Sequence, residues 1–270
     1  MADGQPAADG GGTMQRRLWR TLGVLVAAVV MVIGAGEAGG LLAGQSSTVS
    51  SRYTSVTAVV LDLQEGSADV IAGSDDAVVL TPQLNWTLRR PRVEQTLDGH
   101  TLRISVSCTR ILGIGEPGCS VALDLQVPAA TAVTVRMTSG YGRIAGLSGA
   151  LDLRGTSGEL DLDRDSGPID ARLTSGRISG MRLASAGVRA STDSGQTDLA
   201  FAQPPDQLTL ACDSGSVRAT VPPGSTYRVS ARSAGDAPRI APLLADSGSP
   251  RTITASAGSG TVTLGFTPGD

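Results

Sequence analysis

Few side chains in this sequence have a type and spacing suited to catalysis. All 22 basic side chains are Arg and none is Lys, which excludes a P-loop and a Schiff-base mechanism because both need a lysine amine. His100 is the single histidine; it follows the pair Asp98-Gly99 and is interpreted as a solvated turn residue. No G-x-S-x-G nucleophile elbow occurs. The sequence therefore indicates a protein that is not an enzyme.

Two motifs resemble ligand sites but lack the context that those sites need. The run Gly113–Gly118 matches G-x-G-x-x-G, yet no helical pattern follows that could hold a pyrophosphate. The run Asp161–Gly167 resembles the start of a calcium loop through its aspartates Asp161, Asp163 and Asp165. An EF-hand needs Gly at its sixth position and Glu at its twelfth, and Ser166 and Arg172 stand there instead. We predict no nucleotide, no metal and no other cofactor.

One enzymatic alternative stays open, a carbohydrate-active β-helix that would use carboxylates and arginines on one face. Its candidate residues are Asp152, Arg154, Asp170 and Arg172. Sugar-cleaving clefts commonly carry aromatic platforms, and aromatic residues make up only 3% of this chain. The non-catalytic interpretation is therefore preferred.

The three cysteines divide into a pair and a single residue. Cys108 and Cys119 bracket a short Gly- and Pro-containing loop, and in an exported protein such a pair is typical of a disulfide. Two free buried thiols are the alternative. Cys212 follows Leu208 and Leu210 at alternate positions and is expected to face the core.

The N-terminal part of the sequence predicts a membrane anchor. Residues 1–17 are expected to form a disordered cytoplasmic tail. Residues 18–43 are long and apolar enough for a transmembrane helix, and the arginines before it place the N-terminus inside and the remaining chain outside. A cleaved signal peptide is the alternative. Both interpretations predict export of the remaining chain. The preferred one, the anchor, predicts a single-pass cell-membrane protein.

The exported part divides into a linker and two β-rich regions. Residues 44–52 are polar and are expected to form a linker. Residues 53–137 alternate apolar and polar side chains as strands do, and Asp98-Gly99 predicts a hairpin turn between two of them. This region is expected to lead into a repeat region over residues 138–267.

The repeat is the strongest pattern in the chain. Ser-Gly pairs recur every nine residues from Ser139 to Ser175, slip around residues 184–187 and return at Ser194. Apolar residues two apart follow them, as at Leu160 and Leu162, so that both point to one face of a strand. We expect turns at the repeat glycines, which are Gly140, Gly149, Gly158, Gly167, Gly176, Gly195 and Gly215.

These units predict an all-β protein ending in a single-stranded β-helix or β-solenoid, because stacked copies would share a core that one strand cannot form alone. Two units per turn would place Asp152 on Asp170 and Asp161 on another face. That arrangement is favoured because it reduces the stacking of like carboxylates. An antiparallel sandwich with strands of similar composition is the alternative.

The Thr-Ser-Gly and Asp-Ser-Gly turns, the stretch Cys119–Gly140 and the segments Val221–Val229 and Arg251–Leu264 resemble a bacterial envelope family of "putative adhesins", a domain of unknown function common in actinobacterial membrane proteins. The resemblance covers about Tyr53 to Phe266. It implies a β-helix and brings no catalytic residues.

We therefore expect a structural or binding module at the cell envelope, with an unknown envelope protein or glycan as partner. A regulatory accessory of the envelope-stress response is the second hypothesis. The net charge of −3 gives no support to nucleic acid as a partner.

Overall fold

The computed structural model describes residues 45–268 except 88, 109, 112–113 and 116–118, so the predicted tail and transmembrane helix lie outside the described residues. The described part is all-β, as expected, and contains no helix long and apolar enough to cross a membrane. Its strands are β1 (Gln45–Thr48), β2 (Ser51–Thr54), β3 (Ala58–Gly73), β4 (Ala77–Trp86), β5 (Arg92–Asp98), β6 (Thr101–Ser107), β7 (Arg110–Ile111), β8 (Ile114–Gly115), β9 (Ser120–Pro128), β10 (Ala132–Ala145), β11 (Leu151–Asp163), β12 (Ile169–Leu183), β13 (Gly187–Phe201), β14 (Gln207–Val221), β15 (Arg228–Ser233), β16 (Arg239–Ile240) and β17 (Thr252–Phe266).

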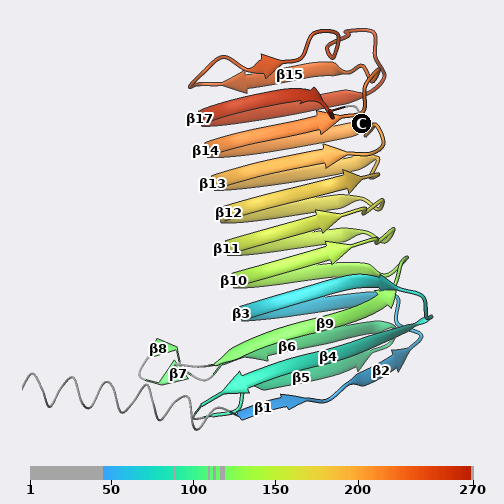
Figure 1. The fold of residues 1–270 in the computed structure, drawn as a ribbon, viewed down its shortest axis with the longest axis vertical. Coiled ribbons are helices and arrows are strands. Elements are labelled where there is room, and N and C mark those ends of the chain that lie inside the picture. The colour runs from blue at the N-terminus through green and yellow to red at the C-terminus, as the bar shows by residue number, and fades with distance from the viewer. Residues whose placement is uncertain (1–44, 88, 109, 112–113, 116–118, 269–270) are drawn as a thin grey trace, which may run out of the picture. The chain divides into compact units, whose positions relative to one another are not determined.

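Except for β7 and β8, these strands form one mixed sheet, in the order β1-β4-β9-β3-β10-β11-β12-β13-β14-β17-β15 along its main path. At the end that contains β1, strand β4 pairs antiparallel with β2 and with β9, and β5 pairs antiparallel with β6. The later long strands pair in parallel (Figure 1). The hairpin predicted at Asp98-Gly99 joins β5 and β6.

The linker prediction for residues 44–52 is wrong for most of its described part. Residues 45–48 form β1, and β2 begins at residue 51. Strand β2 pairs antiparallel with β4, for example Tyr53 with Val78. The side chains of β1 and β2 are exposed or only partly buried while their main chain extends the sheet, so composition alone indicated a linker where tertiary pairing makes strands.

From β10 to β12 the parallel strands stack with an offset of 18 residues, twice the nine-residue repeat, and the offset grows to 19 and 20 residues at β13 and β14. Leu151 pairs with Ile169, 18 residues later, and Asp152 pairs with Asp170. Asp161 lies opposite Ser179 instead, which confirms the expectation that alternate units fall on different faces. The parallel pairing of β10 to β14 excludes the antiparallel sandwich.

Inward-facing aliphatic side chains form the core of this stack. Leu151, Leu160 and Ile169 are 2%, 0% and 3% exposed, as the repeat predicted. The apolar position that precedes each turn also lines up, as in Leu153 and Ala171. Each layer therefore removes the apolar surface of its neighbours from water, which stabilises the stack by roughly 25 cal/mol per Å² buried.

The bend in each long strand is set by a column of glycines. Gly140, Gly158 and Gly176 lie on one another in the parallel register, and Gly66 of β3 continues the column. At Gly158 φ is +137°, and an added Cβ would lie 2.1 Å from the carbonyl oxygen of Gly140. Only glycine fits both constraints. Gly195, Gly215 and Gly260 extend the same column.

The repeat glycines Gly149 and Gly167 form a different corner. They lack the left-handed φ of Gly158, but a Cβ on Gly149 would lie 2.1 Å from the carbonyl oxygen of Thr131, and one on Gly167 would lie 2.0 Å from that of Gly149. The nine-residue spacing thus alternates between two corners of one 18-residue layer.

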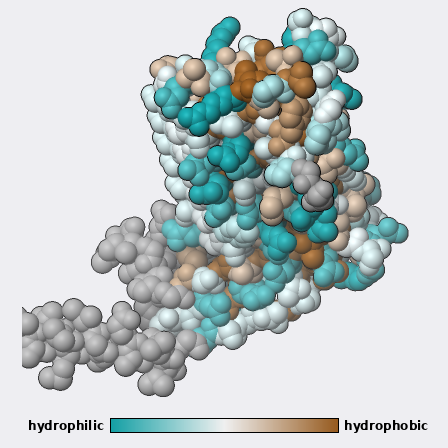
Figure 2. Space-filling model, turned by 45° about the horizontal axis from the view of Figure 1, so that its top comes forward, coloured by the Kyte–Doolittle hydropathy of each residue, from teal (hydrophilic) through white to brown (hydrophobic). Residues whose placement is uncertain are grey.

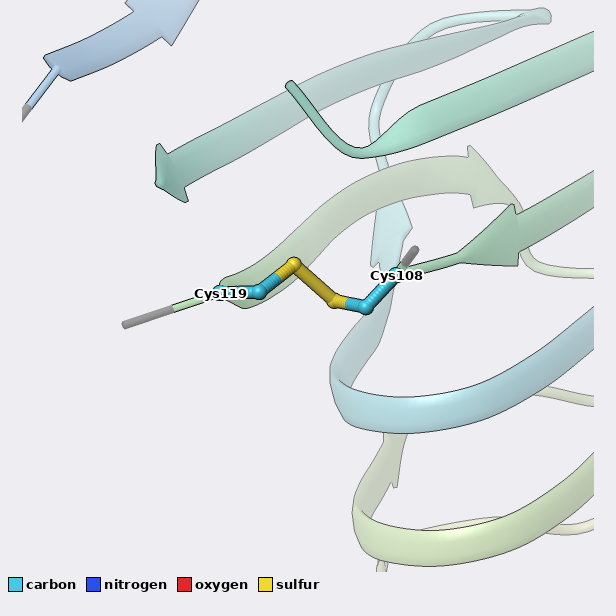
Figure 3. Close-up of a disulfide and its surroundings, with 2 residues drawn as sticks. All are labelled: Cys108 and Cys119. Atoms are coloured by element: carbon cyan, nitrogen blue, oxygen red, sulfur yellow. A yellow bond between two sulfur atoms is a disulfide. The ribbon is translucent and has the colours of Figure 1, made fainter. Parts of the chain in front are cut away.

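A disulfide links the two strands that form the layer beside β3. The first half of β3 pairs with β6 and its second half with β9, so these two strands together make one layer beside β3. Cys108 follows β6 and Cys119 precedes β9, and they are disulfide-bonded with their Cα atoms 6.2 Å apart (Figure 3). The predicted disulfide is confirmed, and it links the ends of two strands that together span the length of β3, whereas β10 to β14 each run through the glycine position as one strand.

We expect Gly158→Ala to lower the free energy of unfolding by about 3 kcal/mol or more, because a strained φ alone costs roughly 1–3 kcal/mol and the new methyl group would also meet a main-chain oxygen. Gly187→Ala is the matched control, since no heavy atom lies within 4 Å of its added Cβ. Urea denaturation measures both. Equal stability of the two variants would contradict the role of the column.

Replacing both Cys108 and Cys119 by Ser should lower the free energy of unfolding by about 3 kcal/mol, because the cross-link restricts the unfolded chain. Guanidinium denaturation of the oxidised parent, the reduced parent and the variant gives the measurement. The reduced parent serves as the control and should match the variant. A variant as stable as the oxidised parent would show that the half-layers need no covalent link.

Candidate functional site

A groove of about 650 Å³ crosses several layers of the stack. It lies on the face formed by the residues that come before the column glycine in each strand. Two repeated columns line it. The first is Arg136, Arg154 and Arg172, which lie opposite one another in register. The second column consists of Thr138, Thr156 and Thr174, one from each successive layer. We call this hollow the arginine–threonine groove.

The two columns have a common origin in the sequence. Each Thr stands directly before a Ser-Gly turn, and each Arg stands two residues before the Thr, so that both point outward. The register repeats every 18 residues, and neighbouring strands are about 4.8 Å apart. Identical side chains therefore recur at one strand spacing along the groove.

The guanidinium groups are held by carboxylates from their own strands or the next. Arg154 Nε donates to Asp152 Oδ1 over 2.9 Å. Arg172 donates to Asp170 through Nε at 2.9 Å and Nη2 at 3.0 Å, and this contact holds the pKa of Asp170 below its ordinary value. Both members of that pair are therefore ionised at neutral pH.

The carboxylates of these pairs face away from the groove. Asp152 and Asp170 line a second hollow of about 450 Å³, whereas their arginines line the arginine–threonine groove. The ion pairs thus form a ridge with a cationic side and an anionic side. At the β3 end of the groove, Asp62 lies 3.5 Å from both Arg103 and Arg136.

The sequence therefore placed Asp152, Arg154, Asp170 and Arg172 together correctly, but it missed other members of the groove. Arg136 and the threonine column could have been found from the 18-residue interval, because each "TSG" turn carries its Thr at the same position. Asp193 takes the place of the threonine in the next layer and also lines the groove.

The three aspartates of the calcium-like motif do not converge. Asp161 lies on the outer face, where Ser179 and Tyr141 donate to it, the latter over 2.6 Å; this bond raises the pKa of Tyr141 to about 12. Asp163 contacts Arg182 over 2.6 Å. Within the described residues no group of three His, Cys, Asp or Glu side chains could hold a metal ion.

The remaining candidates lie apart from the groove. His100 sits in the β5–β6 turn, with Nδ1 2.7 Å from the carbonyl oxygen of Ser55. Cys212 is buried, as expected, and is not disulfide-bonded. Of the G-x-G-x-x-G motif, Gly113 and Gly118 lie outside the described residues.

Asp165 is the most unusual ionisable group in the described residues. It is fully buried, at the corner position that Leu147 and Leu183 occupy in the neighbouring layers. Leu147 N–H donates to its Oδ1 over 2.8 Å, while Oδ2 accepts no hydrogen bond from a described residue. Burial raises its pKa from 3.8 to about 7, because a low-dielectric interior disfavours the charged form.

Comparisons with known proteins give little beyond these observations. No protein family and no curated protein sequence matches the chain. Solved structures with some likeness include a "putative cell adhesion protein" from Clostridium sporogenes and a "putative adhesin" from Bacteroides fragilis. Each is 10% identical with a TM-score of 0.44 and covers 83% of this chain; the match covers 100% and 97% of their own chains.

A "putative lipid binding protein" from Parabacteroides distasonis is 13% identical with a TM-score of 0.28, covering 83% of this chain and 97% of its own. At such TM-scores these likenesses carry no function over to this chain. Membership in the actinobacterial adhesin family stays a prediction.

Asp165 should make stability depend on pH. Its pKa is higher in the folded state than in the unfolded one, so its contribution is full below about pH 4 and is lost as pH rises to about 7, by about 4 kcal/mol at most. The measurement is the difference in free energy of unfolding between the parent and Asp165→Asn, from pH 4 to pH 8. The parent should lose stability relative to the variant across that range, and a constant difference would contradict the prediction.

Proposed function

We propose that this chain is a non-catalytic, membrane-tethered binding module of the cell envelope, whose exported part is a single-stranded β-solenoid that holds its ligand along the arginine–threonine groove. The parallel 18-residue register supports the solenoid, with two nine-residue units in each coil. The Cys108–Cys119 disulfide supports export, because disulfides persist in oxidising compartments. The membrane tether rests on the apolar run at residues 18–43.

The observation that carries this proposal is the repetition of one Arg and one Thr across successive layers of a single hollow. A catalytic centre needs one set of groups at one place, whereas an elongated ligand needs the same contacts again and again. Repeating contacts suit a polymer that lies along the stack axis.

The carbohydrate-active alternative fits the charges less well. A glycosidase needs one carboxylic acid that is still protonated near neutral pH and a second carboxylate beside it. Arg172 lowers the pKa of Asp170 and so removes it as an acid. Asp165 has a raised pKa, but it is buried in the corner and does not line the groove.

The test is retention of envelope polymers and proteins on the immobilised full-length chain. Thr156→Tyr should abolish retention, because a bulky ring would fill the groove. Gln196→Tyr is the matched control: Gln196 is exposed outside the groove, in a register column that already holds Tyr141. Equal retention by both variants, or none by the parent chain, would overturn the proposal, as would release of new reducing ends from a bound glycan.

A further inference from the structure

The guanidinium groups of the groove are fixed in place and still have free donors. Arg154 uses only its Nε in the contact with Asp152, so both of its terminal nitrogens can donate to a ligand. Arg172 spends Nε and Nη2 on Asp170 and keeps Nη1. A side chain already held by a neighbour loses less conformational entropy when it binds.

More cationic than anionic side chains line the groove itself. Its lining contains three guanidinium groups and the carboxylates of Asp62 and Asp193, while Asp152 and Asp170, which pair with Arg154 and Arg172, line the hollow on the other side of the ridge. Planar guanidinium groups match carboxylate geometry and can form two parallel hydrogen bonds with it. The groove therefore favours a ligand with acidic groups.

A ligand with acidic groups alone would leave the hydrogen-bond acceptors of the groove without donors. The carboxylate of Asp193 only accepts hydrogen bonds, and Asp62 has the same chemistry. The hydroxyls of Thr138, Thr156 and Thr174 both donate and accept. A ligand that matches this lining brings hydroxyl donors together with its acidic groups, which a polyphosphate does not.

The spacing of the layers points to the form of the ligand. Arg136, Arg154 and Arg172 recur at one strand spacing, about 4.8 Å, which is close to the advance of one sugar in an extended β-1,4-linked pyranose chain. No Trp, Tyr or Phe is among the residues that line the groove. Binding would therefore depend on charge and hydrogen bonds and not on ring stacking.

We propose, on the basis of the binding function above, that the ligand of the groove is a linear acidic polysaccharide that carries carboxylate groups and lies along the stack axis. Arg154 and Arg172 contact its carboxylates through their free terminal nitrogens. The threonine column and Asp193 contact its hydroxyls.

The experiment measures binding of the full-length chain to a polyuronate, to the same polymer after reduction of its carboxylates to alcohols, and to polyphosphate. The polyuronate should bind, more weakly as salt rises, and the reduced polymer should not. Arg154→Ala should weaken binding roughly ten- to hundredfold, as loss of a charge-assisted hydrogen bond does. Arg154→Lys, which keeps the charge without the planar fork, should lose part of the affinity.

Arg177→Ala is the matched control. Arg177 lies outside the groove, is 53% exposed against 54% for Arg154, and is likewise beside a carboxylate, Glu159 at 3.9 Å. The Arg177→Ala variant should bind the polyuronate with an affinity within about twofold of the parent's, since exposed ion pairs contribute little.

Equal binding of the reduced polymer would overturn the acidic ligand and leave the binding function standing. Equal binding of polyphosphate with the same loss in Arg154→Ala would overturn the polysaccharide. If no polysaccharide binds, this inference fails, and the retention of other envelope material by the parent and Thr156→Tyr still decides the proposed function.

Discussion

The fold depends on the close approach of main chain to main chain at the glycine column. A Cβ on Gly176 would lie 1.9 Å from the carbonyl oxygen of Gly158, and the same holds one layer on at Gly195 over Gly176. Because no side chain fits there, every long strand bends at the same place. The outward positions on either side of the bend then fall into register, and identical residues form columns. The groove is a consequence of this constraint on the backbone.

Much of this arrangement follows from the sequence, because the nine-residue period fixes both the turns and the inward face. Two features of the fold could not be predicted from that period. Strand β3 joins the stack through Gly66, but Glu65 stands where the repeats have Ser, so the region was assigned to the part before the repeats. Residues 45–48 and 51–54 are polar, and only their pairing partners make them strands. Both cases depend on contacts distant in the chain.

The candidate site was only partly predictable, for a related reason. The alternation of Asp152 with Arg154 placed two ion pairs on one outward face, and the 18-residue register confirmed it. Stacked like charges repel, yet Arg154 and Arg172 each have a carboxylate two residues away in their own strand, and Arg136 lies beside Asp62 of the neighbouring strand β3. That local pairing offsets the repulsion between layers. Both sides of the ridge are hollowed, and no residue pattern in the sequence encodes these hollows directly.

The last strands of the stack have different neighbours from the middle ones. β17 sits between β14 and β15 (Figure 1), so Ile253 and Ala255 are covered on both sides, whereas Val229 of β15 is only partly buried. Apolar side chains appear at this end in Figure 2, and Leu243 is 86% exposed. Terminal layers of a repeat stack meet different neighbours and so depart from the repeat. The columns of Arg and Thr lie on β10, β11 and β12, away from this end of the stack.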